Sequence, residues 1–150
     1  YNQVQPYAYG HKSITQNYSH MNEALAHPLG ANFKELITVF EIANGKWTYR
    51  IKTMYANAGL DSVDTHYGQN IFESDFEAST GGQYSYGNFN GQGVSTAILS
   101  FQPEVSFKFQ GFDLFCSVYY RIKESDLLNQ TSAFYSLGIR TFPFSAFQDY

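Results

Sequence analysis

Apolar and polar side chains alternate with a period of two between Val94 and Arg140. From Ser95 to Phe109 the apolar side chains take the odd positions: Ala97, Leu99, Phe101, Pro103, Val105, Phe107 and Phe109. A tight connection at Gln110-Gly111 follows. In the next stretch the apolar side chains take the even positions: Leu114, Cys116, Val118, Tyr120 and Ile122. Alternation over this length predicts two extended strands, each with one apolar and one polar face.

Strand length separates two kinds of β-protein that share this alternation. The patterned stretches run for about eleven to fifteen residues, whereas strands of globular proteins average roughly five to six. A tilted strand needs about 9–11 residues to cross a bilayer, and aromatic side chains gather at its interfaces. We therefore expect an all-β, antiparallel, up-and-down transmembrane β-barrel. A soluble β-sandwich or lipocalin-like barrel, with its apolar face inward, is the alternative.

The amino-acid composition limits the classes of protein to which this chain can belong. Aromatic residues make up 19% of the chain and charged residues only 15%, which is low for a soluble surface. No run of eighteen apolar residues occurs, so a helical membrane span is excluded. The net charge of −4 argues against a nucleic-acid partner.

Six strands are predicted, and their connections alternate in length. The strands cover Val4 to Ser13, Ala31 to Ile42, Lys46 to Ala58, the two stretches on either side of Gln110-Gly111, and Thr131 to about Phe144. Short connections lie at Asn44-Gly45 and Gln110-Gly111, and the longest connections at residues 14–30 and 59–93. Outer-membrane barrels have short periplasmic turns and longer extracellular loops, so residues 14–30 and 59–93 are predicted to be extracellular.

Six strands are fewer than the roughly eight of the smallest outer-membrane barrels. We therefore expect residues 1–150 to be a single barrel domain that forms the C-terminal portion of a larger barrel. Two further strands within residues 59–93 would be the other explanation. The start at Tyr1, without Met or a signal sequence, is expected for a mature form or a fragment.

Two segments carry a resemblance to a known group. The ending Gly138-Ile139-Arg140-Thr141, followed by aromatics up to Tyr150, resembles that of Bacteroidetes-type outer-membrane barrels, including capsule-assembly (Wzi-like) and gliding-motility-associated proteins. The segment from Tyr18 to Phe33 is similar to a loop-to-strand motif of the same group. The resemblance implies a location in the bacterial outer membrane, in contact with its lipids, and it implies no catalytic residue.

The parity of the strands divides the side chains between lipid and lumen. The residues predicted to point to lipid are Ala97, Leu99, Phe101, Val105, Leu114, Cys116, Val118, Tyr120, Leu137 and Ile139. Those predicted to line the lumen are Arg50, Lys52, Glu104, Lys108, Arg121 and Arg140, and Lys123 and Asp113 share their parity. The charges would either pair across neighbouring strands or form a basic lumen that selects anions.

Two groups of metal-ligating residue types give incomplete patterns. His20, Glu23 and His27 lack the spacing of a zinc-binding helix, and Asp61, Asp64 and His66 supply too few oxygens for a calcium loop. No serine stands in a nucleophile-elbow context. We therefore predict no metal site, no cofactor and no enzymatic activity. We interpret these residues as solvated loop residues.

The long loop also contains aromatic residues among Gly and Asn, and Tyr84, Tyr86 and Phe89 are predicted to contact a partner. Aromatics on a polar loop suit stacking on sugars or docking of a protein. The leading hypothesis is a non-enzymatic outer-membrane barrel for surface assembly or export, which docks a polysaccharide or an envelope protein. The alternatives are an outer-membrane channel or transporter for small anionic solutes and a soluble β-sheet binding protein.

Overall fold

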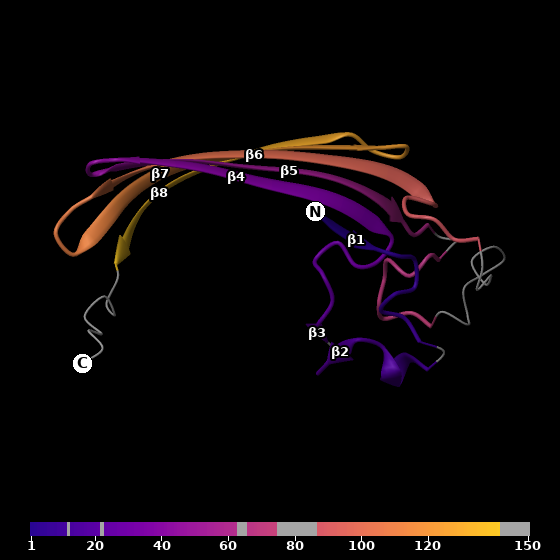
Figure 1. Ribbon diagram of the computed structural model, residues 1–150. Helices are drawn as coiled ribbons and strands as arrows, with labels where there is room; N and C mark the ends of the chain where they lie inside the picture. Colours follow the sequence, from indigo (N-terminus) through magenta and orange to yellow (C-terminus); the bar gives the residue numbers. More distant parts are fainter. Residues whose placement is uncertain (12, 22, 63–65, 75–86, 142–150) are drawn as a thin grey trace. The chain divides into compact units, whose positions relative to one another are not determined.

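The computed structural model describes residues 1–11, 13–21, 23–62, 66–74 and 87–141. This part of the chain is all-β and antiparallel, with a single 3-10 turn, η1 (Ile14–Gln16) (Figure 1). The strands are β1 (Asn2–Val4), β2 (Ser19–His20), β3 (Glu23–Ala24), β4 (Phe33–Asn44), β5 (Trp47–Leu60), β6 (Val94–Lys108), β7 (Phe112–Ser125) and β8 (Gln130–Thr141). Among the described residues, no helix has the length and hydropathy that a membrane span requires.

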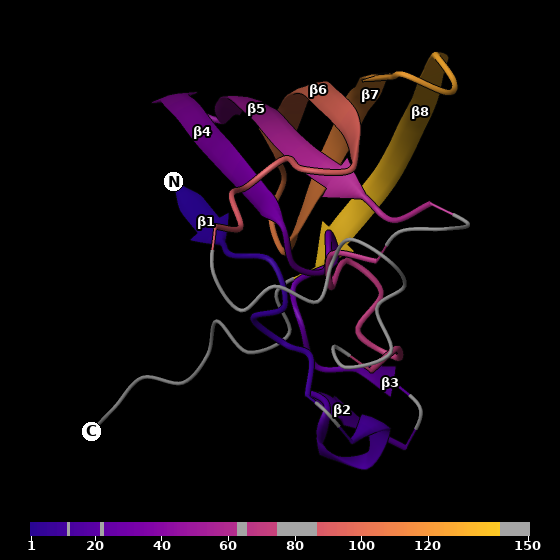
Figure 2. The same cartoon turned by 90° about the vertical axis from the view of Figure 1, so that its right-hand side faces the viewer.

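Six strands form one sheet in the order β1-β4-β5-β6-β7-β8, so the five long strands are neighbours in sequence order (Figures 1 and 2). The predicted all-β, antiparallel arrangement is confirmed, and five of the six predicted strands correspond to β4–β8. In the described part of the chain no pairing joins β8 back to β1, so a closed barrel is not found. Residues 142–150 of the predicted last strand and of the C-terminal resemblance lie outside the described residues.

Glycines in the left-handed region make the two tight turns. Gly45 has φ +63° between β4 and β5, and Gly111 has φ +93° between β6 and β7. A left-handed residue suits the twist of a short hairpin, and glycine takes it without a steric cost. The amide of Lys108 donates to the carbonyl of Lys46 over 2.8 Å, which ties the ends of β5 and β6 together beside these turns.

The first predicted strand, Val4 to Ser13, is wrong. Among the described residues of this range, only Val4 belongs to a strand, β1, which pairs with the start of β4 so that Val4 faces Phe33. The chain turns after Pro6 because Tyr7 takes φ +61° and donates its amide to the carbonyl of Tyr67 over 3.2 Å. Tyr7 thus donates to a distant loop, and Ala8 and Gly10 donate locally to the carbonyls of Gln5 and Tyr7, so none of these three amides pairs with a strand.

The chain divides into two compact units. Unit 1 comprises residues 1–36, 55–98 and 123–130, and unit 2 comprises residues 37–54, 99–122 and 131–150. Unit 1 contains the long connections together with a small apolar core: Ala31, Phe33, Ala56, Ala58, Ile71 and Ile98. The described part of unit 2 is built from strands and their short turns.

A buried asparagine fastens the loops of unit 1. Asn32 is fully buried, with φ +62°, and its Nδ2 donates to the carbonyls of Gly59 over 2.9 Å and Gln92 over 2.7 Å. Its Oδ1 accepts the amide of Gly91 over 2.8 Å. A Cβ on Gly59 would overlap both Gln92 and the Asn32 amide, so this position requires glycine. Three stretches of chain therefore meet at one side chain.

Candidate functional site

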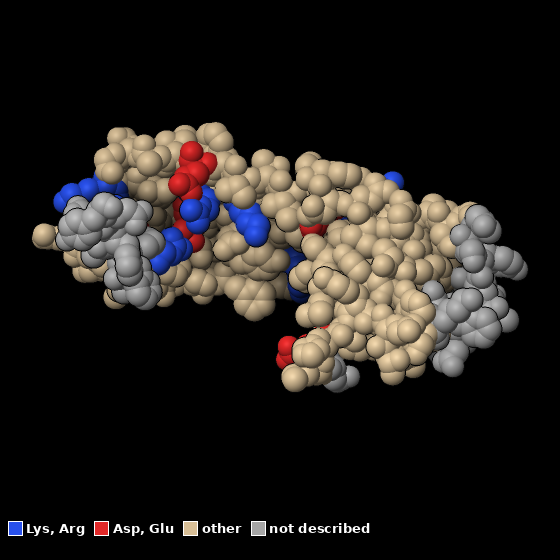
Figure 3. Space-filling model, turned by 60° about the horizontal axis from the view of Figure 1, so that its bottom comes forward, with Lys and Arg blue, Asp and Glu red and all other residues tan. Residues whose placement is uncertain are grey.

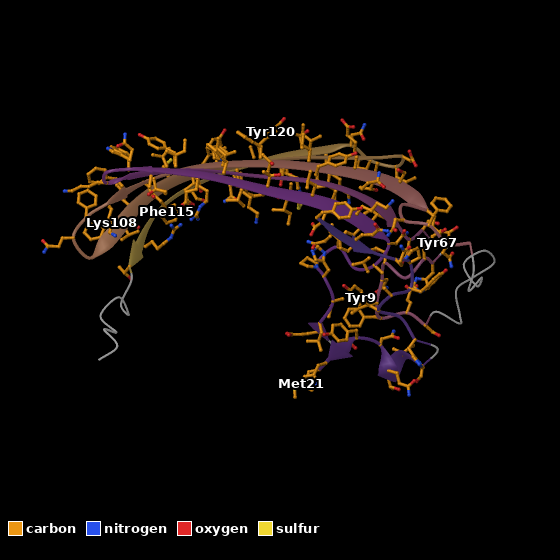
Figure 4. The ribbon with its side chains drawn as sticks, in the orientation of Figure 1. Tyr9, Met21, Tyr67, Lys108, Phe115 and Tyr120 are labelled. Carbon is orange, nitrogen blue, oxygen red and sulfur yellow. The ribbon has the colours of Figure 1, made fainter. Side chains whose placement is uncertain are left out.

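The two faces of the sheet in unit 2 differ in chemistry and in burial. In the described part of unit 2, the buried side chains are those of three serines, Ser100, Ser106 and Ser117. The opposite face exposes large apolar side chains, of which Tyr135 and Leu137 are 81% and 77% exposed. Figure 4 shows Tyr120 on this apolar face and Phe115 on the opposite, polar face. A water-soluble sheet buries its apolar face instead, so the burial is inverted.

The predicted lipid-facing residues of unit 2 lie on this exposed face. Those with large exposed side chains are Leu99, Phe101, Val105, Leu114, Tyr120, Leu137 and Ile139. Cys116 is also exposed and has the same parity along β7. β4 differs, because side chains of both parities are exposed, including Val39 and Phe40.

Aromatic rings cluster on unit 2 next to the two tight turns. Trp47 meets Phe107 edge-on with ring centroids 4.7 Å apart, and Phe107 meets Phe109 in the same way at 4.8 Å. Phe109 stacks on Phe112 at 4.9 Å, and Trp47 on Tyr49 at 6.4 Å. Trp47 is nonetheless 46% exposed, so the cluster, named here the aromatic cluster, presents ring surface outward.

A row of charged side chains crosses the polar face of unit 2. Arg50 on β5 donates from Nε to Oε2 of Glu41 on β4, over 2.6 Å, and its Nη2 lies 2.6 Å from the same oxygen. Its Nη1 lies 3.9 Å from Oε1 of Glu104 on β6. Figure 3 shows red and blue side chains side by side on this face. The charges alternate in sign from strand to strand.

Arg140 completes the row from β8. Its Nη2 lies 3.2 Å from Oε1 and 3.4 Å from Oε2 of Glu104, so one nitrogen reaches both carboxylate oxygens. The side chain crosses over β7, where its Cζ lies 4.9 Å above the ring of Phe115. That ring lies over Gly138, because a Cβ there would be 2.7 Å from it. We call Glu41, Arg50, Glu104 and Arg140 the charged row.

The structure brings together three of the six predicted lumen residues: Arg50, Glu104 and Arg140. Lys52, Lys108 and Arg121 form no ion pair with any described residue. Arg121 instead donates from Nη2 to the hydroxyl of Ser132 over 3.5 Å. Among the described residues, its Nε and Oδ1 of Asp113 are buried without a hydrogen-bond partner. Sequence reasoning missed Glu41, because apolar residues on both parities of β4 hide its orientation.

The second group of candidate ligands becomes a carboxylate–histidine cluster in unit 1. Nδ1 of His66 lies 3.1 Å from Oδ2 of Asp61 and 3.2 Å from Oε2 of Glu73. Asp61 also accepts the amides of Tyr67 over 2.6 Å and Asn70 over 2.9 Å. Glu73 was not predicted here, and Asp64 lies outside the described residues.

Asp61 is held in its charged form. Burial raises the pKa of its carboxyl, but the hydrogen bond from His66, the backbone amides of Asn70 and Tyr67 and the charge of His66 outweigh it, so the pKa lies below its ordinary value. Within the described ranges, no group of three or more His, Cys, Asp and Glu is arranged to hold a metal ion. The cluster therefore ties the chain after β5 to the loop that follows.

The first group of candidate ligands separates. His20 and Glu23 face each other as partners in the β2–β3 hairpin. His27 instead lies with Nε2 3.0 Å from Oε1 of Glu35, a carboxylate that is almost fully buried. Asn2 donates to the same oxygen over 2.6 Å, so Glu35 joins β1, β4 and the loop before β4. Sequence reasoning gave Glu35 no role, since its partners lie far along the chain or in a loop.

Of the predicted partner-binding loop residues, Phe89 is 65% exposed in unit 1. Tyr84 and Tyr86 lie outside the described residues.

Comparisons of the chain with models of known protein families, with curated proteins and with solved structures find no match.

Proposed function

We propose that the chain is part of a non-enzymatic β-barrel of the bacterial outer membrane. Unit 2 supplies membrane-spanning strands, with the apolar face toward lipid and the charged row toward the interior. Unit 1 supplies loops that dock a surface polysaccharide or an envelope protein. The observation that carries the proposal is the inverted burial of unit 2, in which serines are buried and leucines, tyrosines and isoleucine are exposed.

A lipid environment explains the exposed apolar side chains and buried serines of unit 2 more simply than an aqueous environment does. A monomeric soluble protein rarely exposes a contiguous apolar patch of more than a few hundred Å². The exposed side chains of β6, β7 and β8, among them Leu99, Leu114 and Leu137, stand on neighbouring strands. Each is costly in water and costs nothing against acyl chains. Small hydroxyl residues on the other face suit a narrow, polar interior.

The aromatic cluster supports the same orientation. Trp and Tyr prefer the boundary between headgroups and acyl chains, because one end of the ring system is apolar and the other forms hydrogen bonds. Trp47 and Tyr49 lie directly after the turn at Gly45, and Phe107 and Phe112 flank the turn at Gly111. The cluster would therefore mark one membrane interface, with the two turns just outside it.

The charged row fits an interior position. Charged side chains on the lipid side of a strand cost about 2–4 kcal/mol at the bilayer midplane, so strands place them inside. In the interior, Glu104 contacts both Arg50 and Arg140. Because the charged row consists of two glutamates and two arginines, it has no net charge. The free edge of β8 has no partner among the described strands, and a membrane strand requires one. The proposal therefore includes further strands that pair with this edge.

Trp47 is the single tryptophan of the chain and reports directly on the proposal. The protein is reconstituted into phosphatidylcholine vesicles that carry bromine either near the headgroup or deep in the acyl chains. We expect blue-shifted emission that headgroup-level bromine quenches more strongly than deep bromine. Red-shifted emission that aqueous iodide quenches, with no effect of bromine, would refute a membrane position.

The channel for small anions is the second candidate. Lys52, Lys108 and Arg121 have the interior parity and no ion-pair partner among the described residues, so they leave an excess of positive charge. Planar-bilayer conductance with a potassium chloride gradient separates the two functions. A docking scaffold gives no steady conductance, whereas an anion channel gives conductance with a reversal potential toward that of chloride.

A further inference from the structure

A groove in unit 1 has the chemistry of a carbohydrate site. It has a volume of about 470 Å³ and opens to solvent, and its lining includes His27, Gly30, Gln69, Asn70, Ile71 and Phe72. One wall is the chain before β4 and the other is the loop from Gln69 to Phe72. The sequence predicted an extracellular, partner-binding loop at residues 59–93 but assigned no specific role to residues 69–72.

Four contacts hold the loop wall in place. Asn70 donates its amide to Asp61 over 2.9 Å, and its Oδ1 accepts the amide of Phe72 over 3.1 Å. The carbonyl of Ile71 accepts Nδ2 of the buried Asn17 over 2.6 Å. Gln69 lies so close to Gly30 that a Cβ on this glycine would overlap its carbonyl. The groove is therefore preformed, which lowers the entropic cost of binding.

The lining matches the way proteins hold sugars. Phe72 lines the groove and is 40% exposed, and the apolar C–H face of a pyranose ring packs against an exposed aromatic ring. Gln69 also lines the groove, and its side-chain amide, which has both donors and an acceptor, forms no hydrogen bond among the described residues. Ring and amide together offer one stacking surface and one hydrogen-bonding group.

The absence of charge on the lining selects the class of sugar. Among the described residues that line the groove there is no Lys, Arg, Asp or Glu. His27 already contacts Glu35 through Nε2 and accepts the amide of Leu29 at Nδ1. A phosphate or a uronate would find no cation here, and burying an unpaired charge is costly. A neutral glycan requires no such partner.

We propose that this groove binds a neutral oligosaccharide, with a sugar ring on Phe72 and its hydroxyls on Gln69. The inference rests on the docking role proposed for unit 1 and names the class of ligand. An open groove of this size holds a short segment of a longer chain, so the ligand is a polysaccharide segment rather than an enclosed small molecule.

The test uses the full chain in detergent micelles and a panel of neutral oligosaccharides: maltohexaose, mannohexaose and cellohexaose. Polygalacturonate fragments of equal length are the charged counterpart. We expect calorimetry to detect binding of at least one neutral member, with a lower affinity for the charged fragments. Absence of binding by every neutral member, or tighter binding of the charged fragments, would overturn the proposal.

Two variants locate the site. Phe72→Ala and Gln69→Ala should each weaken binding roughly tenfold, which corresponds to about 1.4 kcal/mol. Tyr1→Ala is the matched control, because it removes an exposed aromatic side chain of the same unit that does not line the groove. Unchanged affinity in Phe72→Ala, or a greater loss in Tyr1→Ala, would place the site elsewhere and overturn the proposal.

Emission from Trp47, measured after the same protein is reconstituted into vesicles, separates this proposal from the membrane role. A protein that inserts but binds no neutral oligosaccharide contradicts the groove alone. A protein that binds the oligosaccharide and remains in the aqueous phase contradicts the membrane role alone.

Discussion

Arg140 and Glu104 form an ion pair although their strands, β8 and β6, are not neighbours in the sheet: Nη2 of Arg140 lies 3.2 Å from Oε1 of Glu104. The arginine crosses β7 over the ring of Phe115. Glu104 is 12% exposed, so most of its charge is compensated by protein rather than by water. Removal of one partner of such a pair leaves the other partner underpaired.

Replacement of Arg140 should therefore destabilise the sheet. For Arg140→Met we expect a loss of about 1–2 kcal/mol in the free energy of unfolding, reduced from the buried-pair value because Arg140 is partly exposed. The measurement is urea unfolding in lipid vesicles. Lys52→Met is the control, since Lys52 has no ion pair among the described residues. Equal losses in the two variants would contradict a specific role of the charged row.

Gly138 should tolerate no side chain while Phe115 keeps its position. A Cβ at Gly138 would stand 2.7 Å from the ring, so Gly138→Ala displaces the ring from beneath Arg140. We expect a cost of about 1–3 kcal/mol, as for other overpacked sites. The double variant Gly138→Ala with Phe115→Leu should recover part of that loss. Full additivity of the two substitutions would show that ring and glycine do not interact.

A charge on the apolar face should be costly only in a membrane. Leu137→Arg should lower the free energy of unfolding in vesicles by about 2–4 kcal/mol if Leu137 lies near the midplane. Ser136→Arg places the same charge on the opposite parity of β8 and should cost less. If unfolding in vesicles gives equal values for the two variants, the apolar face does not contact lipid.

Cys116 is the single cysteine and lies exposed on the apolar face. In vesicles we expect it to react with a lipid-soluble maleimide and to resist a membrane-impermeant, charged maleimide. The charged reagent should react after unfolding, which controls for the chemistry of the thiol. Rapid modification of the folded protein in vesicles by the charged reagent would place this face in water.

Asp61 should contribute stability that acid removes. Its pKa in the folded chain lies below the ordinary value of 3.8, so its contribution is complete above that value and is lost as pH falls through the lower, folded pKa. Asp61→Asn should cost about 1.5–3 kcal/mol at pH 7, the range for hydrogen bonds to a charged group. The difference from the unsubstituted protein should shrink below about pH 4. A difference that is independent of pH would contradict this role.

The long strands were predictable because alternation is a local signal. Each of β5 to β8 carries its pattern within its own residues, and left-handed glycines mark the turns at Gly45 and Gly111. The first strand was not predictable, because the partner of Tyr7 is Tyr67, about sixty positions away. No pattern within the first ten residues contains that hydrogen bond.

The charged row was predictable in part for a related reason. Parity placed Arg50, Glu104 and Arg140 on one face, but the contact across β7 depends on the space that Gly138 leaves for Phe115. Glu73 and Glu35 acquire their histidine partners only through loop folding. The groove is likewise hidden from sequence, because its two walls come from segments forty residues apart.

The three hydrogen bonds of the Asn32 side chain, named here the Asn32 junction, determine which positions of unit 1 tolerate substitution. These hydrogen bonds join the start of β4, the end of β5 and the approach to β6, and each depends on a fixed backbone position. In a library of random variants, positions 32 and 59 should therefore admit almost no substitution, while exposed positions such as Ile14 should vary freely. An engineer who wishes to graft a foreign peptide into unit 1 should choose its exposed rim and leave this junction intact.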